Sequence, residues 1–496
     1  MSESYNVLVS EGRLKPRPGL EEHAATGSTV PCNHLSTYQV GSTIYLIRTE
    51  LTVGTGNLDV FSWDGTSWTS RVTGLAGTED NLPWSVQFKG EFLLAPGNGD
   101  LHRATAIGTW ATVDSAQANA SLEPPNVPRV LGANMSRVFL GDGVDQVSGN
   151  RIPYRVWWCS KSDALTWSHG SGAPEEKNAG FQDLMYDNSA ITAFHYADAK
   201  EFLCFKERSF YVAVFKGPPL FYEFEPVSTS YGCPAGHTVC SWEGLVVWMG
   251  QENVYAKQVG SNQVTPIGNA IRSRLKAVMA GSSAKRASAM IDPVLGLYWL
   301  FIPKAGATTC AYMFVCSLRD GFAWAEGEIS HSDIRVMKAH VFNAGTMDAR
   351  LLLGSRDGKI YRLSGTALTD GGTGFEAYFW SKTLDFLEIQ KGMKQGVEGH
   401  ETGEIQKISL MGDSGTATGR VRAGATPAAV ESSASLAFGD FDMSQAEGQS
   451  YKAEPYGRPN AYRFAQVGAH WASGTTSPMA LDGVTFWGMP RGEARE

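Results

Sequence analysis

Cysteine and histidine side chains stand close together in the stretch CPAGHTVC, residues 233–240. Cys233, His237 and Cys240 could bind zinc, because thiolate and imidazole are the groups that hold this metal in proteins. Their spacing is not that of a known zinc knuckle, and no fourth ligand follows close by in the sequence. Cys240 also begins an apolar stretch, Cys-Ser-Trp. We therefore predict a loop that leads into a core cysteine, and we expect no metal site.

The other motifs that could do chemistry are weak. Asp142 and Asp145 could contact Ca²⁺, but their segment lacks the oxygen-rich spacing of a calcium loop, so we expect a plain turn. His195 and His340 lie in stretches typical of strands, where a histidine is more often a core residue than a ligand. The sequence contains no P-loop, GxGxxG, GxSxG or HExxH motif. We therefore expect no enzymatic activity and no cofactor.

A turn in which an aspartate stands four residues before a tryptophan is more specific. It occurs in FSWDGTSW, CSKSDALTW and CSLRDGFAW, and the pairs are Asp64 and Trp68, Asp163 and Trp167, and Asp320 and Trp324. Glycine directly follows Asp64 and Asp320, as a tight turn with a positive φ requires. Sialidase-type propellers carry a related element, the Asp box, in which the aspartate and the tryptophan are five residues apart.

We interpret these three turns as structural. The aspartate would accept hydrogen bonds within its own turn, and the tryptophan would fill the core between strands. A sialidase would also need an arginine triad, a tyrosine nucleophile and an acid, and no local motif indicates such a set. The carboxylate pair of a glycoside hydrolase cannot be recognised in one sequence, because its members need not be adjacent. A propeller hydrolase therefore stays an alternative.

Composition and charge limit the classes of protein. The chain has 496 residues, of which 43% are hydrophobic, so it can bury a sizeable core. Its 55 glycines and 14 tryptophans are typical of short strands joined by tight turns. A net charge of −8 argues against a basic face that grips nucleic acid, although DNA could slide past a neutral or acidic wall.

Cysteine usage and hydropathy bear on the compartment. The seven cysteines are scattered, odd in number and without a CxxC pair, which predicts buried free thiols in a reducing compartment. The N-terminal stretch lacks an apolar run of signal-peptide length. No window of 18 apolar residues predicts a membrane-spanning segment.

Residues 27–385 show strand after strand, with turn signals between them. The clearest predicted strands are 42–48, 58–63, 91–96, 136–143, 154–160, 201–215, 244–250, 296–303 and 349–355. Turns recur about every 8–15 residues, a rhythm that favours an all-β sandwich, barrel or propeller. A hairpin turn followed by an apolar residue and a tyrosine also repeats, at 44–45, 210–211, 254–255 and 360–361. Together with the three aspartate turns, this repetition predicts an irregular β-propeller of about five to seven blades.

Three further segments complete the predicted organisation. Residues 1–26 are expected to form an N-terminal arm and 386–496 a C-terminal β-sandwich-like domain, which follows a glycine-rich loop near residue 370. In residues 268–281, Ile271, Leu275 and Val278 recur at helical spacing, which predicts one short amphipathic helix on the surface.

Several stretches, taken in order, resemble one known family. GRLKPRPGL at 12–20 is similar to the N-terminal segment of podovirus-type phage tail nozzle proteins. These are the packaged-DNA-stabilisation proteins and, more distantly, tail tubular protein B. The later stretches SRVFLGDG, YRVWWCSKSDALTW, EFLCFKERSFYVAVF, GLVVWMGQENVYAKQVG and YMFVCSLRDGFAW look like that family's successive blades.

The resemblance implies a structural virion protein. In the family, six copies form a ring below the portal and adaptor, extend the DNA channel, help to retain the packaged genome and dock fibres or spikes. It implies a location in the virion tail, synthesis in the host cytoplasm, and no sequence-specific contact with the DNA that passes through. A receptor- or glycan-binding propeller of a tail fibre or spike is the alternative from another class.

Overall fold

The structure is a computed structural model. It describes residues 3–113, 124–161, 164–167, 179–217, 221–278, 282–343, 349–364, 368–380, 384–385, 402–412, 416–424, 436–442, 450–453, 464–473 and 481–491.

The chain divides into two compact units. The first, here called the propeller unit, comprises Glu22–Met313 and Ser332–Arg362. The second, the sandwich unit, comprises Met1–Glu21, Phe314–His331 and Leu363–Glu496. The bounds of these units differ from the predicted boundaries at residues 26 and 385. The reason is that short strands near the N-terminus pair with strands from the C-terminal part.

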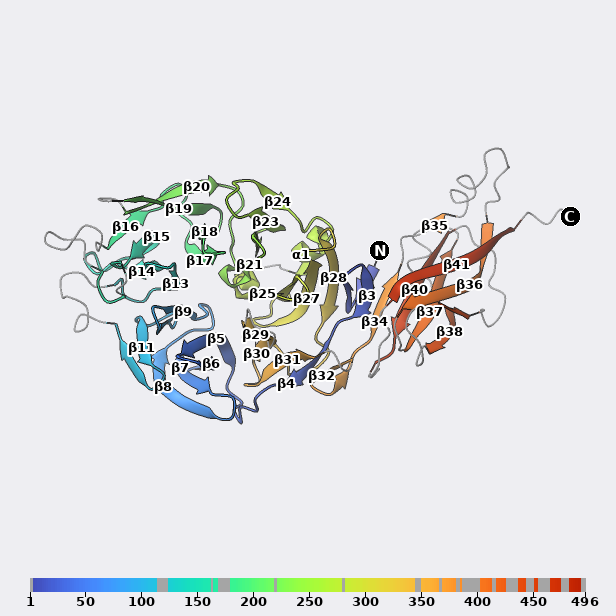
Figure 1. The fold of residues 1–496 in the computed structure, drawn as a ribbon, viewed down its shortest axis with the longest axis horizontal. Helices are drawn as coiled ribbons and strands as arrows, with labels where there is room; N and C mark the ends of the chain where they lie inside the picture. Colours follow the sequence, from blue (N-terminus) through green and yellow to red (C-terminus); the bar gives the residue numbers. More distant parts are fainter. Residues whose placement is uncertain are drawn as a thin grey trace. The chain divides into compact units, whose positions relative to one another are not determined.

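Five consecutive antiparallel sheets, each of four strands, form most of the propeller unit (Figure 1). Their strands are β5 (Cys32–Val40), β6 (Thr43–Thr52), β7 (Asn57–Trp63) and β8 (Trp68–Ala76); β9 (Trp84–Phe88), β10 (Glu91–Ala95), β11 (His102–Ala106) and β12 (Thr109–Thr112); β13 (Val130–Ala133), β14 (Val138–Val144), β15 (Arg151–Trp158) and β16 (Gly180–Asp183); β17 (Ile191–Ala197), β18 (Glu201–Lys206), β19 (Phe210–Gly217) and β20 (Phe221–Ser228); and β21 (Cys240–Trp242), β22 (Leu245–Met249), β23 (Val254–Gln258) and β24 (Val264–Pro266). Each sheet is a meander in which sequential strands pair, as in a propeller blade.

Two further groups of strands continue the series. The sixth consists of β25 (Ser288–Asp292), β26 (Leu297–Pro303) and β27 (Cys310–Ser317), and the strand that follows in the sequence, β28 (Ala323–Glu328), belongs to the sandwich unit. The seventh contains β29 (Val336–Phe342), β30 (Arg350–Ser355) and β31 (Ile360–Ser364). Both groups again pair strands that follow one another in the sequence.

The first strands of the seven groups close a ring within the propeller unit. β5 packs beside β9, β9 beside β13 and β13 beside β17. β17 contacts the 3-10 helix η2 (Gly236–Thr238), which contacts β25. β25 contacts both β21 and β29, and β29 lies against β5. Figure 1 shows these sheets following one another from blue through green to yellow. In the described residues the chain is therefore an all-β protein whose propeller has seven blade-like groups of strands, at the upper end of the predicted five to seven blades.

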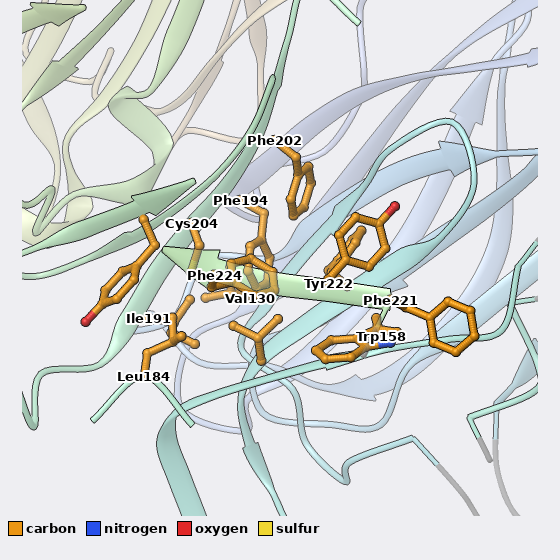
Figure 2. Close-up of a cluster of buried hydrophobic side chains, with 13 residues drawn as sticks. Val130, Trp158, Leu184, Ile191, Phe194, Phe202, Cys204, Phe221, Tyr222 and Phe224 are labelled. Atoms are coloured by element: carbon orange, nitrogen blue, oxygen red, sulfur yellow. The ribbon is translucent and has the colours of Figure 1, made fainter. Parts of the chain in front are cut away.

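The hydrophobic core lies between neighbouring blades rather than in one central mass. Figure 2 shows the cluster between the third and fourth blades, in which Trp158 lies with Phe194, Phe202 and Tyr222. Phe139 belongs to the same cluster. Phe139 and Phe202 have ring centroids 4.2 Å apart, close enough for direct aromatic contact. Equivalent clusters fill the spaces between the first and second, second and third, fourth and fifth, and seventh and first blades.

One glycine is required by this close packing. A Cβ atom placed on Gly132 in β13 would lie 2.3 Å from the Cβ atom of Phe194 in β17. Real Cβ atoms do not approach so closely, so the two inner strands can lie side by side only because residue 132 has no side chain.

The sandwich unit contains two sheets with strands from both ends of the chain. One has the order β28, β1, β34, β40, β37, β38 and the other β2, β3, β41, β36, β39. Their bounds are β1 (Glu3–Tyr5), β2 (Val7–Ser10), β3 (Arg13–Pro16), β34 (Ala377–Trp380), β36 (Thr402–Gly412), β37 (Thr416–Gly424), β38 (Leu436–Asp442), β39 (Ser450–Ala453), β40 (Phe464–Trp471) and β41 (Leu481–Arg491). Short strands β4 (Gly19–Glu22), β32 (Thr369–Asp370), β33 (Thr373–Gly374) and β35 (Leu384–Asp385) complete the list. The predicted sandwich-like C-terminal domain is confirmed as a fold, and the N-terminal strands β1–β3 are part of its sheets.

A buried ion pair joins the N-terminal segment to the rest of the sandwich unit. The Arg17 guanidinium donates to both carboxylate oxygens of Asp370, at 2.9 and 2.6 Å, and the two side chains are 1% and 0% exposed. Arg17 also donates from Nε to Asn6 Oδ1 at 2.9 Å and lies over the ring of Phe375 at 3.6 Å. The Ser330 backbone amide donates to Asp370 at 2.9 Å. Every charged group of this cluster is therefore hydrogen-bonded away from solvent.

The predicted surface helix is present in the propeller unit as α1 (Arg272–Val278). Leu275 is its buried residue, and Ile271 in the preceding turn is also buried. Two 3-10 helices, η2 (Gly236–Thr238) and η3 (Ser282–Arg286), are the other helical segments of the described chain.

Candidate functional site

In chain order, the three aspartate turns follow β7, β15 and β27, the third strands of the first, third and sixth groups. Asp64 and Asp320 stand in short hairpins, between β7 and β8 and between β27 and β28. In the third group β15 ends at Trp158 and β16 begins only at Gly180, so the described residues show an equivalent short hairpin in two of the three places.

The first turn holds its aspartate as a surface cap. Asp64 Oδ1 accepts hydrogen bonds from the Thr66 and Ser67 backbone amides, both at 2.9 Å, and from the Thr66 hydroxyl at 2.8 Å. These bonds, that of the Ser67 amide first, lower the pKa of the Asp64 carboxyl to about 2. Trp68 is only half-buried; its Nε1 donates to the Ala24 carbonyl at 3.1 Å, and the Arg48 guanidinium lies 4.4 Å from its ring centroid. The geometry stabilises a turn and offers no reacting centre.

The second turn lies partly outside the described residues, and the third turn uses its aspartate to bind a neighbouring hairpin as well. Asp163 is not among the described residues, but Trp167 is buried between the second and third blades and donates to the Ala164 carbonyl at 2.8 Å. Asp320 accepts from Ser317 Oγ in its own turn at 2.6 Å. It also accepts from the backbone amides of Glu11 and Gly12 at 3.0 and 3.1 Å, and thus holds the hairpin turn between β2 and β3. Trp324 is 8% exposed.

The three zinc candidates of the loop at 233–240 do not converge on one point. Cys233 is buried and its thiol contacts the Ala235 carbonyl and the Thr238 hydroxyl, at 3.2 and 3.6 Å. His237 instead stacks on Trp84, with ring centroids 4.1 Å apart. Burial raises the pKa of both the Cys233 and the Cys240 thiol to about 12, so both are protonated at neutral pH. Among the described residues, no group of three or more His, Cys, Asp or Glu side chains is arranged to hold a metal ion.

The two candidate Ca²⁺ ligands, Asp142 and Asp145, accept hydrogen bonds from arginines. Arg151 donates to Asp142 Oδ1 at 3.1 Å, and Arg155 to Asp145 Oδ1 at 3.2 Å. Asp145 also accepts from Ser148 within its own turn. Both carboxylates thus bind arginines of β15 within the third blade.

A cavity of about 360 Å³ lies among the inner strands of the propeller unit. Residues from five of the seven groups line it: Trp84 of β9, His195 of β17, His237 of η2 with Cys240, Ser241 and Trp242 of β21, Ala289, Met290 and Ile291 of β25, and Lys338, Ala339, His340 and Val341 of β29. Because these strands are the innermost ones, the cavity lies on the propeller axis, and we call it the axial cavity. Its described lining combines imidazole and ammonium groups with two indole rings.

Hydrogen bonds between blades position the basic groups of the axial cavity. Lys338 Nζ lies 2.7 Å from His237 Nδ1, which links β29 to η2. His340 Nε2 lies 2.9 Å from the Thr37 hydroxyl of β5. Lys338 and His340 are two residues apart on one strand, so strand geometry directs both side chains to the same side.

A third histidine adds to this basic cluster beside the cavity. His34 Nε2 lies 2.8 Å from the Ser85 hydroxyl, linking β5 to β9. Burial is the largest cause that lowers the pKa values of His34 and His237; the charge of Lys338 adds to it in both, and His340 (for His34) and His34 (for His237) add to it when they are protonated. These four side chains therefore form one electrostatically coupled group contributed by β5, η2 and β29.

Burial sets the protonation states in the axial cavity. It lowers the pKa of the Lys338 ammonium from 10.5 to about 8. Burial first, and the positive charge of Lys338 second, lower the pKa of His340 to about 3. Burial lowers the pKa of His195 to about 4 and moves those of His34 and His237 well below 6.5. At neutral pH the histidines are neutral, and Lys338 carries the positive charge of the lining.

Sequence reasoning classified His195 and His340 as core residues and did not single out Lys338. The residues of the cluster are separated by up to about three hundred positions in the chain, and no local spacing joins them. The alternation of Lys338 and His340 within an apolar strand was the one local signal, because it places two basic groups on one side of a buried strand.

Comparisons with known proteins show no family. No family model matches the chain, and no curated protein matches it. Among solved structures, a streptogramin B lyase gives a TM-score of 0.44 at 10% identity, over 70% of this chain and 97% of the other. BamB from Moraxella catarrhalis gives 0.37 at 8% identity, over 70% and 97%, and the N-terminal domain of Nup159 gives 0.38 at 9%, over 73% and 99%.

The strand order and ring closure described above, rather than these weak similarities, define the class of this chain. It is a β-propeller protein with a second, sandwich-like β unit. In the described part of the chain, none of the helices has the length and apolar character needed to cross a membrane.

Proposed function

We propose that this propeller protein is a structural component of a bacteriophage tail, of the nozzle type. Six copies would form a ring that extends the DNA channel below the portal and adaptor, retains the packaged DNA and anchors fibres or spikes. The resemblance of successive stretches to this family, in chain order, is the observation that carries the proposal. The propeller with an added β unit is compatible with it.

The N-terminal stretch of the resemblance, GRLKPRPGL, includes a residue with a structural role. Arg17 within it pairs with Asp370 inside the sandwich unit.

A nozzle ring also makes physical demands that this chain can meet. Blades with paired strands leave few free edges, which suits a component that bears the pressure of packaged DNA. A closed ring needs a head-to-tail interface that repeats with rotation. The net charge of −8 is compatible with a channel wall along which DNA passes without being bound.

The alternatives are a receptor- or glycan-binding propeller of a tail fibre or spike, and a propeller glycoside hydrolase. Glycoside hydrolysis uses two carboxyl groups that flank the scissile bond. The axial cavity offers imidazole and ammonium groups in its described lining instead, which favours binding over hydrolysis at this place.

The test is the copy number of the chain in purified phage particles, measured by quantitative mass spectrometry against the major capsid protein. A ring on the tail axis predicts about six copies per particle. A larger multiple of three would contradict the ring and favour a fibre or spike. Absence from the particle would refute both virion proposals, and loss of a cell-surface glycan on incubation with the protein would then support a hydrolase.

A further inference from the structure

The axial cavity has the features of a ligand site that the proposed structural role does not use. We infer that it binds a small organic carboxylate, with the carboxylate group held at Lys338 and an apolar body against Trp242 and Met290. This inference is independent of the proposed place in a virion, because every residue that it uses lies in the propeller unit of a single chain.

The first argument is the charge in the cavity. Lys338 Nζ is placed against His237 Nδ1 at 2.7 Å, and among the described residues no carboxylate forms an ion pair with it. Lys338 is partly buried, and the two fully buried lysines of the propeller unit are neutralised: Lys206 lies 2.7 Å from Asp187, and Lys257 lies 2.6 Å from Glu201. Buried cations are normally paired, so an ammonium without an acidic partner creates a site for an anion.

The second argument is an imidazole without a hydrogen-bond partner in the lining of the same cavity. His195 lines the cavity, and its Nε2 atom is buried without a hydrogen-bond partner. A buried polar atom of this kind costs free energy unless something binds to it. A carboxylate has two acceptor oxygens and can accept from both an ammonium and an imidazole N–H.

The third argument is the apolar part of the lining. Trp84, Trp242, Met290, Ile291 and Val341 give the cavity indole and aliphatic walls. Its volume of about 360 Å³ suits a small molecule. Apolar walls with a few convergent polar groups are the usual composition of a small-molecule site. An inorganic anion would leave these walls unused, whereas an aromatic or aliphatic carboxylate would cover them.

The fourth argument is proton linkage. An anion beside Lys338 favours its charged form, so binding raises a pKa that burial has lowered to about 8. Affinity should therefore fall as the pH rises through this value. The titratable groups that interact with Lys338 are His340 of its own strand, His34 of β5, His237 of η2 and Cys240 of β21, and His195 of β17 lines the same cavity. The histidines are neutral and the thiol is protonated between pH 7 and pH 9, because their pKa values lie outside this window.

The probe is 4-fluorobenzoate, and its binding to the purified full chain is followed by ¹⁹F NMR line broadening. The neutral 4-fluorobenzamide has the same shape and is the matched control ligand. We expect broadening for the carboxylate and little for the amide, with weaker binding at pH 9 than at pH 7. This comparison needs no variant, so it does not depend on a substitution that could impair folding. No broadening with 4-fluorobenzoate at millimolar concentration, or equal broadening with the amide, would overturn the inference.

Two variants locate the binding. Lys338→Met keeps the length of the side chain and removes its charge, and we expect roughly tenfold weaker binding, the value of about one charged hydrogen bond. Lys276→Met, on the exposed surface of α1, should bind the probe as the parent protein does. Equal affinity of the Lys338 variant would refute the placement at Lys338. Displacement of the probe by inorganic phosphate at a similar concentration would refute the role given to the apolar walls.

Discussion

Removal of the Arg17 charge tests whether the N-terminal segment is an integral part of the sandwich unit. Arg17→Met keeps an unbranched side chain of similar length and leaves Asp370 without its guanidinium partner. Asp370 is fully buried, and its remaining donors are the backbone amide and hydroxyl of Ser330, at 2.9 and 3.0 Å. Two neutral hydrogen bonds do not replace a bidentate charged pair. The variant therefore leaves a buried carboxylate without charge compensation.

The magnitude follows from this geometry. Breaking a buried ion pair by removing one partner costs about 3–5 kcal/mol, because an unpaired charge stays in the interior. Arg17 also loses its bond to Asn6 Oδ1 and its position over the Phe375 ring, which places the expected loss at the upper part of this range. The double variant with Asp370→Leu removes both charges and should recover part of the stability, because no charge then remains buried.

Urea unfolding followed by circular dichroism measures the free energy of unfolding of each variant. Arg272→Met is the matched control, since Arg272 pairs with Glu252 at 2.5 Å but both side chains are about half exposed. We expect no measurable change for this exposed pair. A loss below about 1 kcal/mol for Arg17→Met, or a double variant less stable than both single variants, would contradict the reasoning.

Three further predictions concern the propeller unit. Trp167→Ala should lower the free energy of unfolding by about 3–5 kcal/mol in urea titration, because this buried indole fills the space between two blades; a loss like that of an exposed residue would contradict its core role. Gly132→Ala should lower the melting temperature, at a cost of about 1–3 kcal/mol, because the new Cβ atom meets Phe194, and unchanged melting would contradict the packing of β13 on β17. Acid should destabilise the fold below about pH 6.5, because the unfolded chain then binds protons at His195 and His340 while the folded chain does so only near pH 4 and pH 3. The free energy of unfolding should therefore depend on pH, and replacement of both histidines by glutamine should reduce this dependence by up to about 1.4 kcal/mol per pH unit for each histidine. An unchanged pH dependence, in melts at several pH values, would contradict the neutral state of the two histidines.

The all-β class was predictable because its signals are local. A strand needs only a few residues of apolar or alternating character, and a turn needs a glycine or an aspartate at a fixed place. The hairpins around Tyr211, Tyr255 and Tyr361 illustrate this, since each tyrosine lies at the start of the third strand of its blade. Repetition of such hairpins indicated a propeller without any knowledge of which blades touch.

The bounds of the parts were harder to predict. Strands β1–β3 have only three or four residues each, and their partners in the sandwich unit lie more than three hundred positions away. A short strand with a distant partner has no signature of its own, so the sequence predicted residues 1–26 only as an N-terminal arm, without strands. The three-part division, the location in a virion and the six-fold ring stay predictions.

The sequence by itself determined the strands, the turns and the repeating character of this protein, because these depend on residues that are neighbours in the chain. Tertiary structure decided the number of blades, the pairing of Arg17 with Asp370 and the axial cavity at Lys338. The physical reason is that ring closure brings the first strand of every blade to one axis. Side chains from β5, β9, β17, β21, β25 and β29 then share a low-dielectric space, and their pKa values depend on neighbours that no local pattern identifies.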